Sequence, residues 1–205
     1  MMPILSIVMP AYNEEKMIMK AANSISQLLE KEQINWEILF VNDGSKDNTW
    51  QEIQRASQEL SNVRGISFSR NFGKEAAILA GIEHAKGDCC VVMDCDLQHP
   101  PETVIEMYRL WEDGFEIVEG VKKSRGQEGK IKSLFTKGFY RLINQATGFD
   151  MSTSSDFKLL DRKVVDAYLK LPERKLFFRA LSFWLGYKSI VVEFEVQDRV
   201  EGETK

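Results

Sequence analysis

Cys89–Pro101 reads Cys-Cys-Val-Val-Met-Asp-Cys-Asp-Leu-Gln-His-Pro-Pro, and the interpretation of the chain starts from this stretch. Its first five residues, Cys89–Met93, are uncharged and mostly apolar, which predicts a short strand buried on both faces. Asp94, Asp96 and Gln98 follow and place three oxygen-bearing side chains at the carboxyl end of that strand. Such oxygens suit Mg²⁺ or Mn²⁺ bound together with phosphate groups, because these ions take few protein ligands. Asp is also common in solvated turns, so this stretch alone leaves both interpretations open.

The composition is that of an ordinary globular protein. The chain has 205 residues, of which 43% are hydrophobic and 28% charged, enough for one sizeable α/β domain. A net charge of −4 excludes a general basic field for nucleic acid. With only His84 and His99, neither a zinc site nor a serine-type triad is expected. The cysteines at 89, 90 and 95 lack metal-ligand spacing and are expected to be reduced core thiols of a cytosolic domain.

The hydrophobic pattern predicts alternating strands and helices. No apolar run approaches the roughly 18 residues of a membrane span, and no basic leader precedes the first strand. The alternation predicts a mostly parallel sheet with helices on both faces. Asn13 is expected to cap the first helix. The predicted strands are Ile4–Met9, Trp36–Val41, Val63–Phe68, Cys89–Met93 and Phe115–Val118.

The second half of the chain is richer in basic residues. Lys122, Arg125 and further cations up to Arg141 cluster on a polar loop and on the helix expected after it. Two interpretations stay open: a solvated helix face, or a basic amphipathic surface against anionic lipid head groups. The remaining predicted elements are an apolar segment at Phe157–Leu160, helices around Val164–Leu169 and Leu176–Leu185, and an edge strand at Ser189–Val196.

Polar groups follow four of the predicted strands, and the carboxyl ends of parallel strands meet at one edge of a sheet. Tyr12 could stack on a flat base, and Asp43 could accept a hydrogen bond from a base N–H. A cation at the acidic pair would bridge a diphosphate and neutralise it as a leaving group. The pattern predicts a site for an activated nucleotide, without the Gly-rich fingerprint of a dinucleotide fold or a P-loop. The converging groups are Pro10, Tyr12, Asn13, Glu14, Asn42, Asp43, Arg70, Lys74, Asp94, Asp96 and Gln98.

Five short motifs occur in order along nearly the whole chain. They are Pro-Ala-Tyr-Asn-Glu at 10–14, Val-Asn-Asp-Gly-Ser at 41–45, Arg-Asn-Phe-Gly-Lys at 70–74, Asp-Cys-Asp-Leu-Gln at 94–98 and Asp-Phe-Lys-Leu at 156–159. Together they resemble family 2 glycosyltransferases of the GT-A fold, in the branch of polyprenyl-phosphate hexosyltransferases. The resemblance implies a nucleotide-diphospho-sugar donor of the UDP-glucose or GDP-mannose type, Mg²⁺ or Mn²⁺, and a polyprenyl phosphate acceptor at the membrane surface.

The same resemblance implies roles for single residues. Asp156 matches an acceptor-side carboxylate, and Arg199 matches a basic residue near the diphosphate. Lys122 stands where relatives commonly place Arg, so it would contact phosphate as a point charge. Arg70, Lys74 and Arg125 are expected near the diphosphate and the acceptor, and a structural ion pair stays equally open for Arg70 and Lys74. The nucleoside would be held by Pro10, Tyr12, Glu14 and Asp43, and the cation and diphosphate by Asp94, Asp96 and Gln98.

The expected reaction is an inverting single displacement on the sugar donor. A phosphate acceptor is already anionic, so Asp156 would position it; with a saccharide hydroxyl as acceptor, Asp156 would be the general base. Asp96 and Asp156 are the residues expected to be essential. Other interpretations are a nucleotidyltransferase or a non-catalytic sugar-nucleotide-binding domain.

One catalytic domain is expected over residues 1–205. Residues 1–120 would form its nucleotide-sugar and metal-binding half, and residues 121–205 its acceptor-binding half. By the resemblance, close relatives continue into membrane helices beyond the position of Lys205. The chain is therefore expected to be either a truncated catalytic domain, which is the favoured interpretation, or a soluble relative, and to act at the cytoplasmic face of the membrane. The sugar, the nucleotide and the formation of a homo-oligomer are left open.

Overall fold

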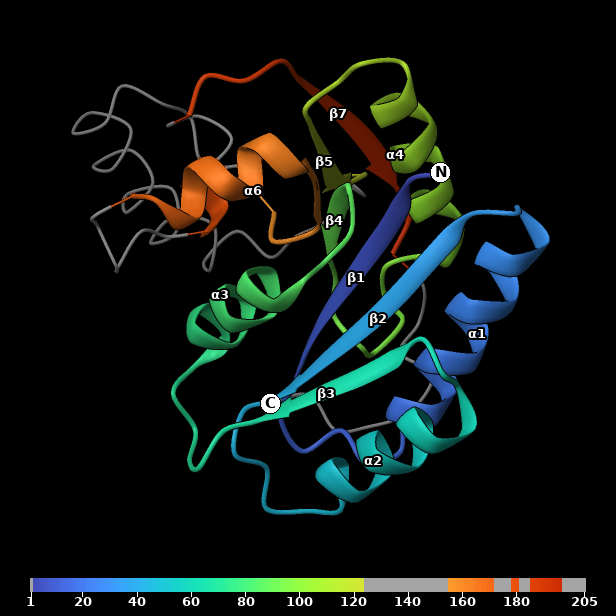
Figure 1. Ribbon diagram of the computed structural model, residues 1–205, viewed down its shortest axis with the longest axis vertical. Coiled ribbons are helices and arrows are strands. Elements are labelled where there is room, and N and C mark those ends of the chain that lie inside the picture. Colours follow the sequence, from blue (N-terminus) through green and yellow to red (C-terminus); the bar gives the residue numbers. More distant parts are fainter. Residues whose placement is uncertain (1, 124–154, 172–177, 181–184, 197–205) are drawn as a thin grey trace, which may run out of the picture.

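The structure is a computed structural model that describes residues 2–123, 155–171, 178–180 and 185–196 (Figure 1). Strands and helices alternate through the first half, as the hydrophobic pattern predicts. The elements are β1 Ile4–Ala11, α1 Ile18–Lys31, β2 Asn35–Asn42, α2 Thr49–Glu59, β3 Val63–Ser67, α3 Lys74–His84, β4 Cys89–Val92, α4 Pro101–Glu112, β5 Ile117–Lys122, β6 Lys158–Asp161, α6 Arg162–Leu169, the 3₁₀ turn η1 Phe178–Ala180 and β7 Ser189–Phe194.

The strands form one mixed sheet of seven strands in the order β3-β2-β1-β4-β6-β5-β7. β3, β2, β1 and β4 are parallel to one another. β6 pairs antiparallel with both β4 and β5, and β7 lies parallel to β5 at the edge. The described sheet is therefore mostly parallel, as predicted, with β6 as its reversed strand.

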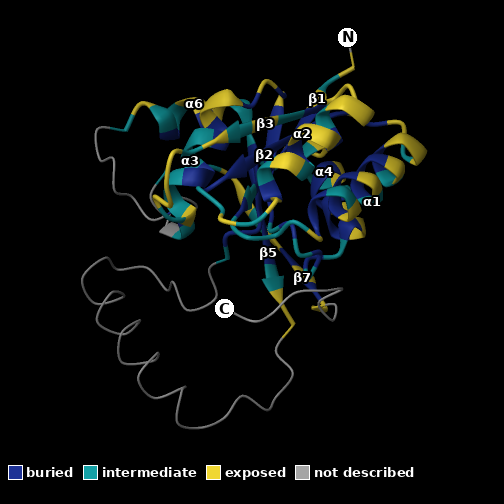
Figure 2. Ribbon diagram, turned by 90° about the horizontal axis from the view of Figure 1, so that it is seen from below, coloured by how far each residue is buried: buried dark blue, intermediate teal, exposed yellow. Residues whose placement is uncertain are grey.

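Helices cover both faces of the sheet (Figure 1). α1, α2 and α4 lie on one side and α3 and α6 on the other. Successive strand residues point to opposite faces, so Ile7 joins the core under α1 while Val8 joins the core under α3. Figure 2 shows this arrangement as buried strands between helices whose outer faces are exposed.

β4 is the central strand predicted from the opening stretch, and it is buried on both faces. Cys89 and Val91 belong to one core, and Cys90 and Val92 to the other. Cys89, Cys90 and Cys95 are free and buried, as expected, and burial raises the pKa of each thiol.

Three sequence predictions differ from the structure. Asn13 does not cap the first helix, because α1 begins only at Ile18 and Met17 occupies the cap position. Asn13 instead adopts a left-handed backbone with φ 53° in the loop before it. The fifth strand is Ile117–Lys122, later than predicted. Of the predicted helix around Leu176–Leu185, the structure describes Phe178–Ala180, which form a 3₁₀ turn, and residue 185.

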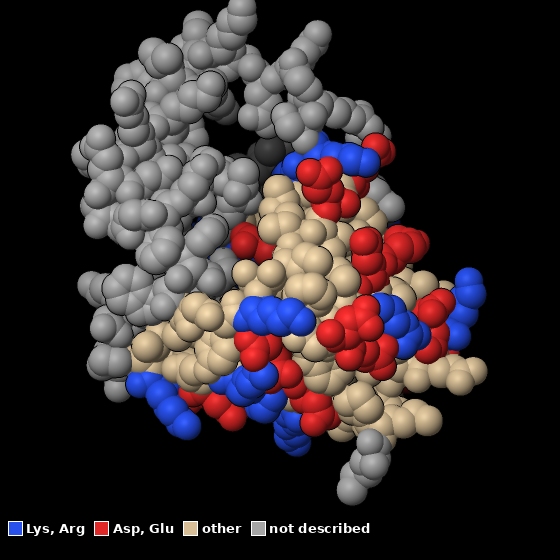
Figure 3. Space-filling model, turned by 90° about the horizontal axis from the view of Figure 1, so that it is seen from above, with Lys and Arg blue, Asp and Glu red and all other residues tan. Residues whose placement is uncertain are grey.

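None of the helices within the described ranges has the length and apolar character needed to cross a lipid bilayer. The face shown in Figure 3 carries acidic and basic side chains interspersed with one another. The predicted basic loop and helix after Lys123 lie outside the described residues.

Candidate active site

A cavity of about 520 Å³ lies where the chain changes direction within the sheet. The chain runs outward from β1 to β2 and β3, then returns to β4 on the other side of β1. Ligands of open α/β sheets bind at such a switch point, outside the carboxyl ends of the strands. The sequence-predicted residues that line the cavity are Pro10, Tyr12, Glu14, Asp43, Lys74, Asp94 and Asp96.

The acidic pair lies on the turn that follows β4. Leu97 has a left-handed backbone with φ 57°, and Asp96 Oδ1 accepts a hydrogen bond from the Gln98 N–H at 3.1 Å. This tight turn places both carboxylates at the cavity while Leu97 remains buried. Two carboxylates with open space beside them fit Mg²⁺ or Mn²⁺ that is completed by phosphate oxygens. Among the described residues, no group of three or more His, Cys, Asp or Glu side chains could hold a metal by itself.

The loop after β1 is held by the loop after β2. The Asn13 N–H donates to Ser45 Oγ at 2.9 Å, and the Lys46 N–H donates to Asn13 Oδ1 at 2.8 Å. The Glu14 N–H donates to Thr49 Oγ1 at 2.8 Å. These hydrogen bonds keep Tyr12 and Glu14 at the wall of the cavity. Both residues are among those expected from the family resemblance to hold a nucleoside.

Asp43 has a structural role that the sequence did not indicate. Its two carboxylate oxygens accept the N–H groups of Phe72 and Gly73 at 2.7 and 3.0 Å. Asp43 is only 4% exposed, and these two hydrogen bonds anchor the loop between β3 and α3. Carboxylate oxygens can accept more than one hydrogen bond each, so this role leaves capacity for a base N–H.

Lys74 links the acidic pair to Asp156. Its Nζ lies 2.7 Å from Asp94 Oδ1 and 3.1 Å from Asp156 Oδ2. Desolvation opposes the charged ammonium, but the two carboxylates outweigh it and raise the pKa of Lys74. Lys74 thus forms the ion pair that the sequence left open, and it also lines the cavity.

Asp156 is held by two cations. Arg179 in η1 donates through Nε and a terminal nitrogen to its two oxygens at 2.8 and 3.0 Å. Burial alone would raise the pKa of Asp156, but the Arg179 hydrogen bonds and the charges of Lys74 and Arg179 lower it to about 2. A carboxylate with that pKa is a weak proton acceptor, which suits a positioning role better than general-base catalysis.

Sequence reasoning missed His99 as part of this site. The ring is 7% exposed, stacks on Phe157 with centroids 4.5 Å apart, and meets the Phe194 ring edge-on at 5.4 Å. His99 Nδ1 accepts the Asp94 N–H at 3.4 Å. Burial lowers the pKa of His99, so the imidazole is neutral and can accept this bond. The imidazole thereby connects the acidic turn to the residue that follows Asp156.

A buried ion pair supports the segment that carries Asp156. Lys158 is fully buried, and its Nζ lies 2.5 Å from Glu119 Oε1 on the neighbouring strand. Glu119 also accepts the Ser155 N–H at 2.7 Å. Residues 119 and 158 are direct cross-strand partners, a relation that depends on β6 being antiparallel and so was not readable from the sequence.

Besides Asp156, five further residues to which a role was assigned from the sequence are not among those that line the cavity. Gln98 contributes its backbone N–H to the acidic turn. Arg70 places its guanidinium 4.1 Å from the centroid of the Phe72 ring, and Lys122 is exposed at the end of β5. Arg125 and Arg199 lie outside the described residues. The roles expected for these five stay predictions.

Comparison with known proteins agrees with this architecture. Residues 6–169 match the family described as glycosyl transferase family 2. "Uncharacterized glycosyltransferase YkcC" of Bacillus subtilis (strain 168) is 41% identical over 201 residues, which cover 98% of this chain and 62% of that protein. "Prophage bactoprenol glucosyl transferase homolog" of Escherichia coli (strain K12) is 35% identical over 202 residues, which cover 98% of this chain and 66% of that protein. The chain thus spans roughly two thirds of the length of these relatives or slightly less.

A solved structure with the same fold is glucosyl-3-phosphoglycerate synthase from Mycobacterium tuberculosis in complex with Mn²⁺, UDP-glucose and phosphoglyceric acid. It has a TM-score of 0.69 and 21% identity, with 98% of this chain and 73% of that chain covered. The mannosyltransferase PcManGT from Pyrobaculum calidifontis, in complex with GDP-Man and Mn²⁺, has a TM-score of 0.65 and 18% identity, with 98% and 59% covered. At these identities the likeness shows the fold, which is GT-A. By its sequence and its fold, the chain belongs to glycosyl transferase family 2.

Proposed function

We propose that the chain transfers a hexose from a nucleotide-diphospho-sugar to a polyprenyl phosphate, with Mg²⁺ or Mn²⁺ and with inversion at the anomeric carbon. The observation that carries the proposal is the cavity after β1, β2 and β4. It brings Tyr12 and Asp43 together with Asp94 and Asp96, and Lys74 connects it to Asp156. The residues expected on the donor side and the residue expected on the acceptor side are therefore close in space.

On the donor side, Tyr12 would stack on the base and Asp43 would accept a base N–H, with Pro10 and Glu14 completing the nucleoside pocket. Asp94 and Asp96 would hold the cation. A bound divalent ion would neutralise the diphosphate as it leaves. Mn²⁺ accompanies the sugar nucleotide in the two solved structures compared above, which supports this assignment.

On the acceptor side, the environment of Asp156 favours a phosphate over a sugar hydroxyl. Arg179 and Lys74 keep its pKa far below neutrality, so it is a poor base for an alcohol. A phosphate acceptor needs no such base, and the same two cations would attract it. The relatives named bactoprenol glucosyl transferase support a polyprenyl phosphate as that acceptor. The cytoplasmic face of a membrane is the place of action that we propose with it.

The test is a transfer assay with UDP-glucose and GDP-mannose in parallel, each with and without undecaprenyl phosphate and with Mg²⁺, Mn²⁺ or chelator. Formation of a glycosyl-lipid that requires both lipid and cation is the expected result. Release of hexose 1-phosphate, the leaving group when the nucleotidyl group of the donor is transferred, would instead indicate a nucleotidyltransferase, and saturable binding without turnover a non-catalytic domain. Transfer only to a saccharide would replace the proposed acceptor.

Asp96→Asn provides the matching loss-of-function variant. It removes one carboxylate charge at the cation site with little change in volume, so turnover should fall by about 10² or more. Glu83→Gln is the control, because it removes one charge from the exposed surface of α3. Full activity of Asp96→Asn with unchanged chelator sensitivity would remove the cation assignment.

A further inference from the structure

The ammonium group of Lys74 lies where a divalent cation bound to Asp94 would have to lie. Its ammonium lies 2.7 Å from Asp94 Oδ1, on the carboxylate expected to bind the divalent ion, and 3.1 Å from Asp156 Oδ2 on the acceptor side. We propose that Lys74 is an internal counter-cation which a divalent ion displaces from Asp94, so that its ammonium becomes available to the acceptor anion beside Asp156. This inference rests on the proposed function and adds an order of binding to it.

Competition follows from charge and geometry. Two cations cannot share one carboxylate oxygen at contact distance, because their mutual repulsion at such a separation is severe in a partly enclosed site. The Lys74 side chain is 41% exposed and Asp94 is 37% exposed, so the ammonium can leave without disrupting a buried core. Asp156 is 9% exposed and keeps its bidentate partner Arg179, so it stays in place when Lys74 moves.

The backbone around Lys74 is fixed on both sides, which confines the change to the side chain. Asp43 holds the N–H groups of Phe72 and Gly73, directly before Lys74. Glu75, directly after it, accepts the Phe178 N–H at 3.0 Å from η1. The ammonium group therefore moves by side-chain rotation alone, between the acidic turn and Asp156.

A consequence is that donor and acceptor bind in a preferred order. Without a divalent ion, Lys74 pairs with Asp94 and Asp156 together and is not available to an incoming phosphate. Once the ion is bound to Asp94, the positive charge of Lys74 is compensated only by Asp156. The ammonium can then also pair with an anion such as the acceptor phosphate. The donor with its cation should thus strengthen binding of the acceptor phosphate.

The test measures Mn²⁺ affinity of the 205-residue chain by electron paramagnetic resonance of free Mn²⁺, with no nucleotide and no lipid. Lys74→Met should bind Mn²⁺ about three- to tenfold tighter than wild type, because its competitor is gone and the lost ion pair is partly exposed. Lys86→Met is the matched control: it also removes one exposed lysine charge, from the loop before β4, and should bind like wild type.

Unchanged or weaker Mn²⁺ binding by Lys74→Met would overturn the inference, as would equal tightening in Lys86→Met. Lys74→Gln repeats the measurement should the Met variant melt at a lower temperature. A lysine that merely contacts the diphosphate would leave Mn²⁺ binding without nucleotide unchanged. Because this readout uses neither donor nor acceptor, it stands even where the transfer assay fails for every lipid, so the two failures are distinguishable.

Discussion

The environment of Asp156 makes it an ionised side chain across the physiological range. Its pKa of about 2 lies below that of an unfolded Asp, so its stabilising pairs are complete above about pH 4 and are lost only as pH falls through the folded value. Asp156→Asn keeps the shape but removes the charge that orients Arg179 and Lys74. We expect kcat to fall by about 10²-fold, the scale of a misplaced reactant, while the UDP and Mn²⁺ dissociation constants stay within about twofold.

Calorimetric titration with UDP and Mn²⁺, alongside transfer kinetics, checks this expectation. The control is Asp166→Asn, which removes a carboxylate 52% exposed on α6. If Asp156→Asn lost donor affinity in proportion to rate, Asp156 would belong to the donor site.

His99 provides a second prediction, because its two kinds of contact can be removed separately. His99→Phe keeps an aromatic ring against Phe157 but leaves the Asp94 N–H without its acceptor. We expect Mn²⁺ affinity to fall about three- to tenfold with little change in melting temperature. His99→Asn retains an acceptor near the Nδ1 position but loses the ring, so stability should fall by about 2 kcal/mol while Mn²⁺ affinity is largely kept.

Melting curves and Mn²⁺ titrations of the two variants test both contacts. Lower Mn²⁺ affinity in His99→Phe together with lower stability in His99→Asn would show that His99 positions the acidic turn and also packs against it. Parallel losses of stability and affinity in both variants would reduce His99 to a core residue.

Individual site residues differed in how far the sequence could predict them. Asp94, Asp96 and Tyr12 follow strands directly, so the parallel-sheet pattern placed them correctly at one edge. The partnership of Asp156 with Arg179 and that of Asp43 with Phe72 join segments far apart in the chain. Such pairs depend on how loops fold over the sheet edge, and no periodicity in the sequence encodes that.

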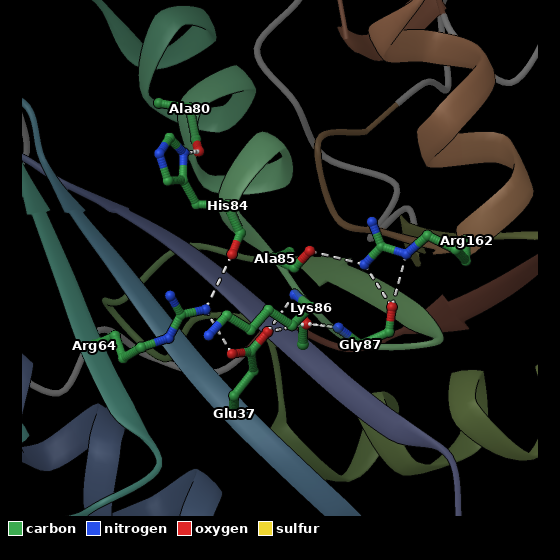
Figure 4. A network of polar contacts seen from close by, with 9 residues as sticks. Glu37, Arg64, Ala80, His84, Ala85, Lys86, Gly87 and Arg162 are labelled. Atoms are coloured by element: carbon green, nitrogen blue, oxygen red, sulfur yellow. Dashed lines mark hydrogen bonds and ion pairs between the residues drawn. The ribbon is translucent and has the colours of Figure 1, made fainter.

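At the opposite end of the strands, one buried carboxylate joins several elements (Figure 4). Glu37 on β2 accepts from Ser6 Oγ on β1 and from the Lys86 N–H, each at 2.6 Å, and pairs with Arg64 on β3 at 2.6 Å. Arg162 at the start of α6 donates to the carbonyl of Gly87 at 2.8 Å. The network fastens the loop between α3 and β4 to three strands and one helix.

Glu37→Gln should therefore lower the free energy of unfolding by about 2 kcal/mol at pH 7, the scale of hydrogen bonds to a buried charge. Burial opposes ionisation of Glu37, but its hydrogen bonds and Arg64 outweigh it and lower the pKa. The contribution is thus full above the unfolded pKa and is lost as pH falls through the folded one. Urea unfolding should show a wild-type advantage at pH 7 that shrinks below about pH 4.

Glu52→Gln is the control for this network, because the Glu52–Arg55 pair lies at the surface, with Arg55 exposed and Glu52 partly exposed, and its atoms are 3.7 Å apart. Its effect should stay below about 0.5 kcal/mol. A difference between wild type and Glu37→Gln that did not depend on pH would mean that the Glu37 charge is not what stabilises the loop.

The loops at the site end approach each other closely at Gly44. Its backbone is left-handed, with φ 64°, and a Cβ there would collide with the backbone of Arg70 and Asn71. Gly44→Ala should destabilise the chain by about 2–3 kcal/mol and weaken UDP binding, since the loop that Asp43 anchors must shift. Gly114→Ala is the matched control, because Gly114 has φ 89° but open space around it.

Unfolding and UDP titration of both variants separate the two effects. Gly114→Ala should show only the strain of its backbone, about 1 kcal/mol, with unchanged UDP affinity. Equal behaviour of the two variants would mean that contact between the loops does not matter for the site.

The strand and helix elements were largely predictable, whereas their junctions were not. β1, β2 and β4 follow apolar runs that are typical of a buried parallel sheet, whereas β3, with the sequence Val-Arg-Gly-Ile-Ser, is partly exposed. The loop at Asn13 has the composition of a helix cap, but the side chain is used to bond Lys46 in a neighbouring loop. Tertiary hydrogen bonds thus override the local capping preference of Asn.

At the scale of the whole molecule, too, one part of the arrangement could be predicted from the sequence and another could not. The two cores on either face of the sheet follow from the alternation of residues such as Ile7 and Val8. The reversal of β6 did not follow from the sequence, because a four-residue strand has no signature of direction. That reversal inserts β6 between β4 and β5 and brings Asp156 beside the acidic turn, so the acceptor side depends on it.

A site assembled from both halves of the chain should couple ligand binding to global stability. A ligand that binds only the folded state at 100 times its dissociation constant stabilises it by about 2.7 kcal/mol. For a chain of this length the melting temperature should rise by about 5–10 °C. We expect this shift with UDP and Mn²⁺ together and much smaller shifts with either alone, because the cation is proposed to bridge Asp94 and Asp96 to the diphosphate.

Differential scanning fluorimetry with UDP, GDP and Mn²⁺, singly and combined, measures the effect and also identifies the preferred nucleotide. Asp96→Asn should abolish the combined shift, whereas Glu83→Gln should keep it. A full shift with UDP alone would contradict a bridging cation, since the nucleotide would then be held by the protein groups of the cavity without it. Because unfolding of the sheet removes the cavity, a ligand-induced shift reports on the folded assembly of β1, β2 and β4 and not on one loop.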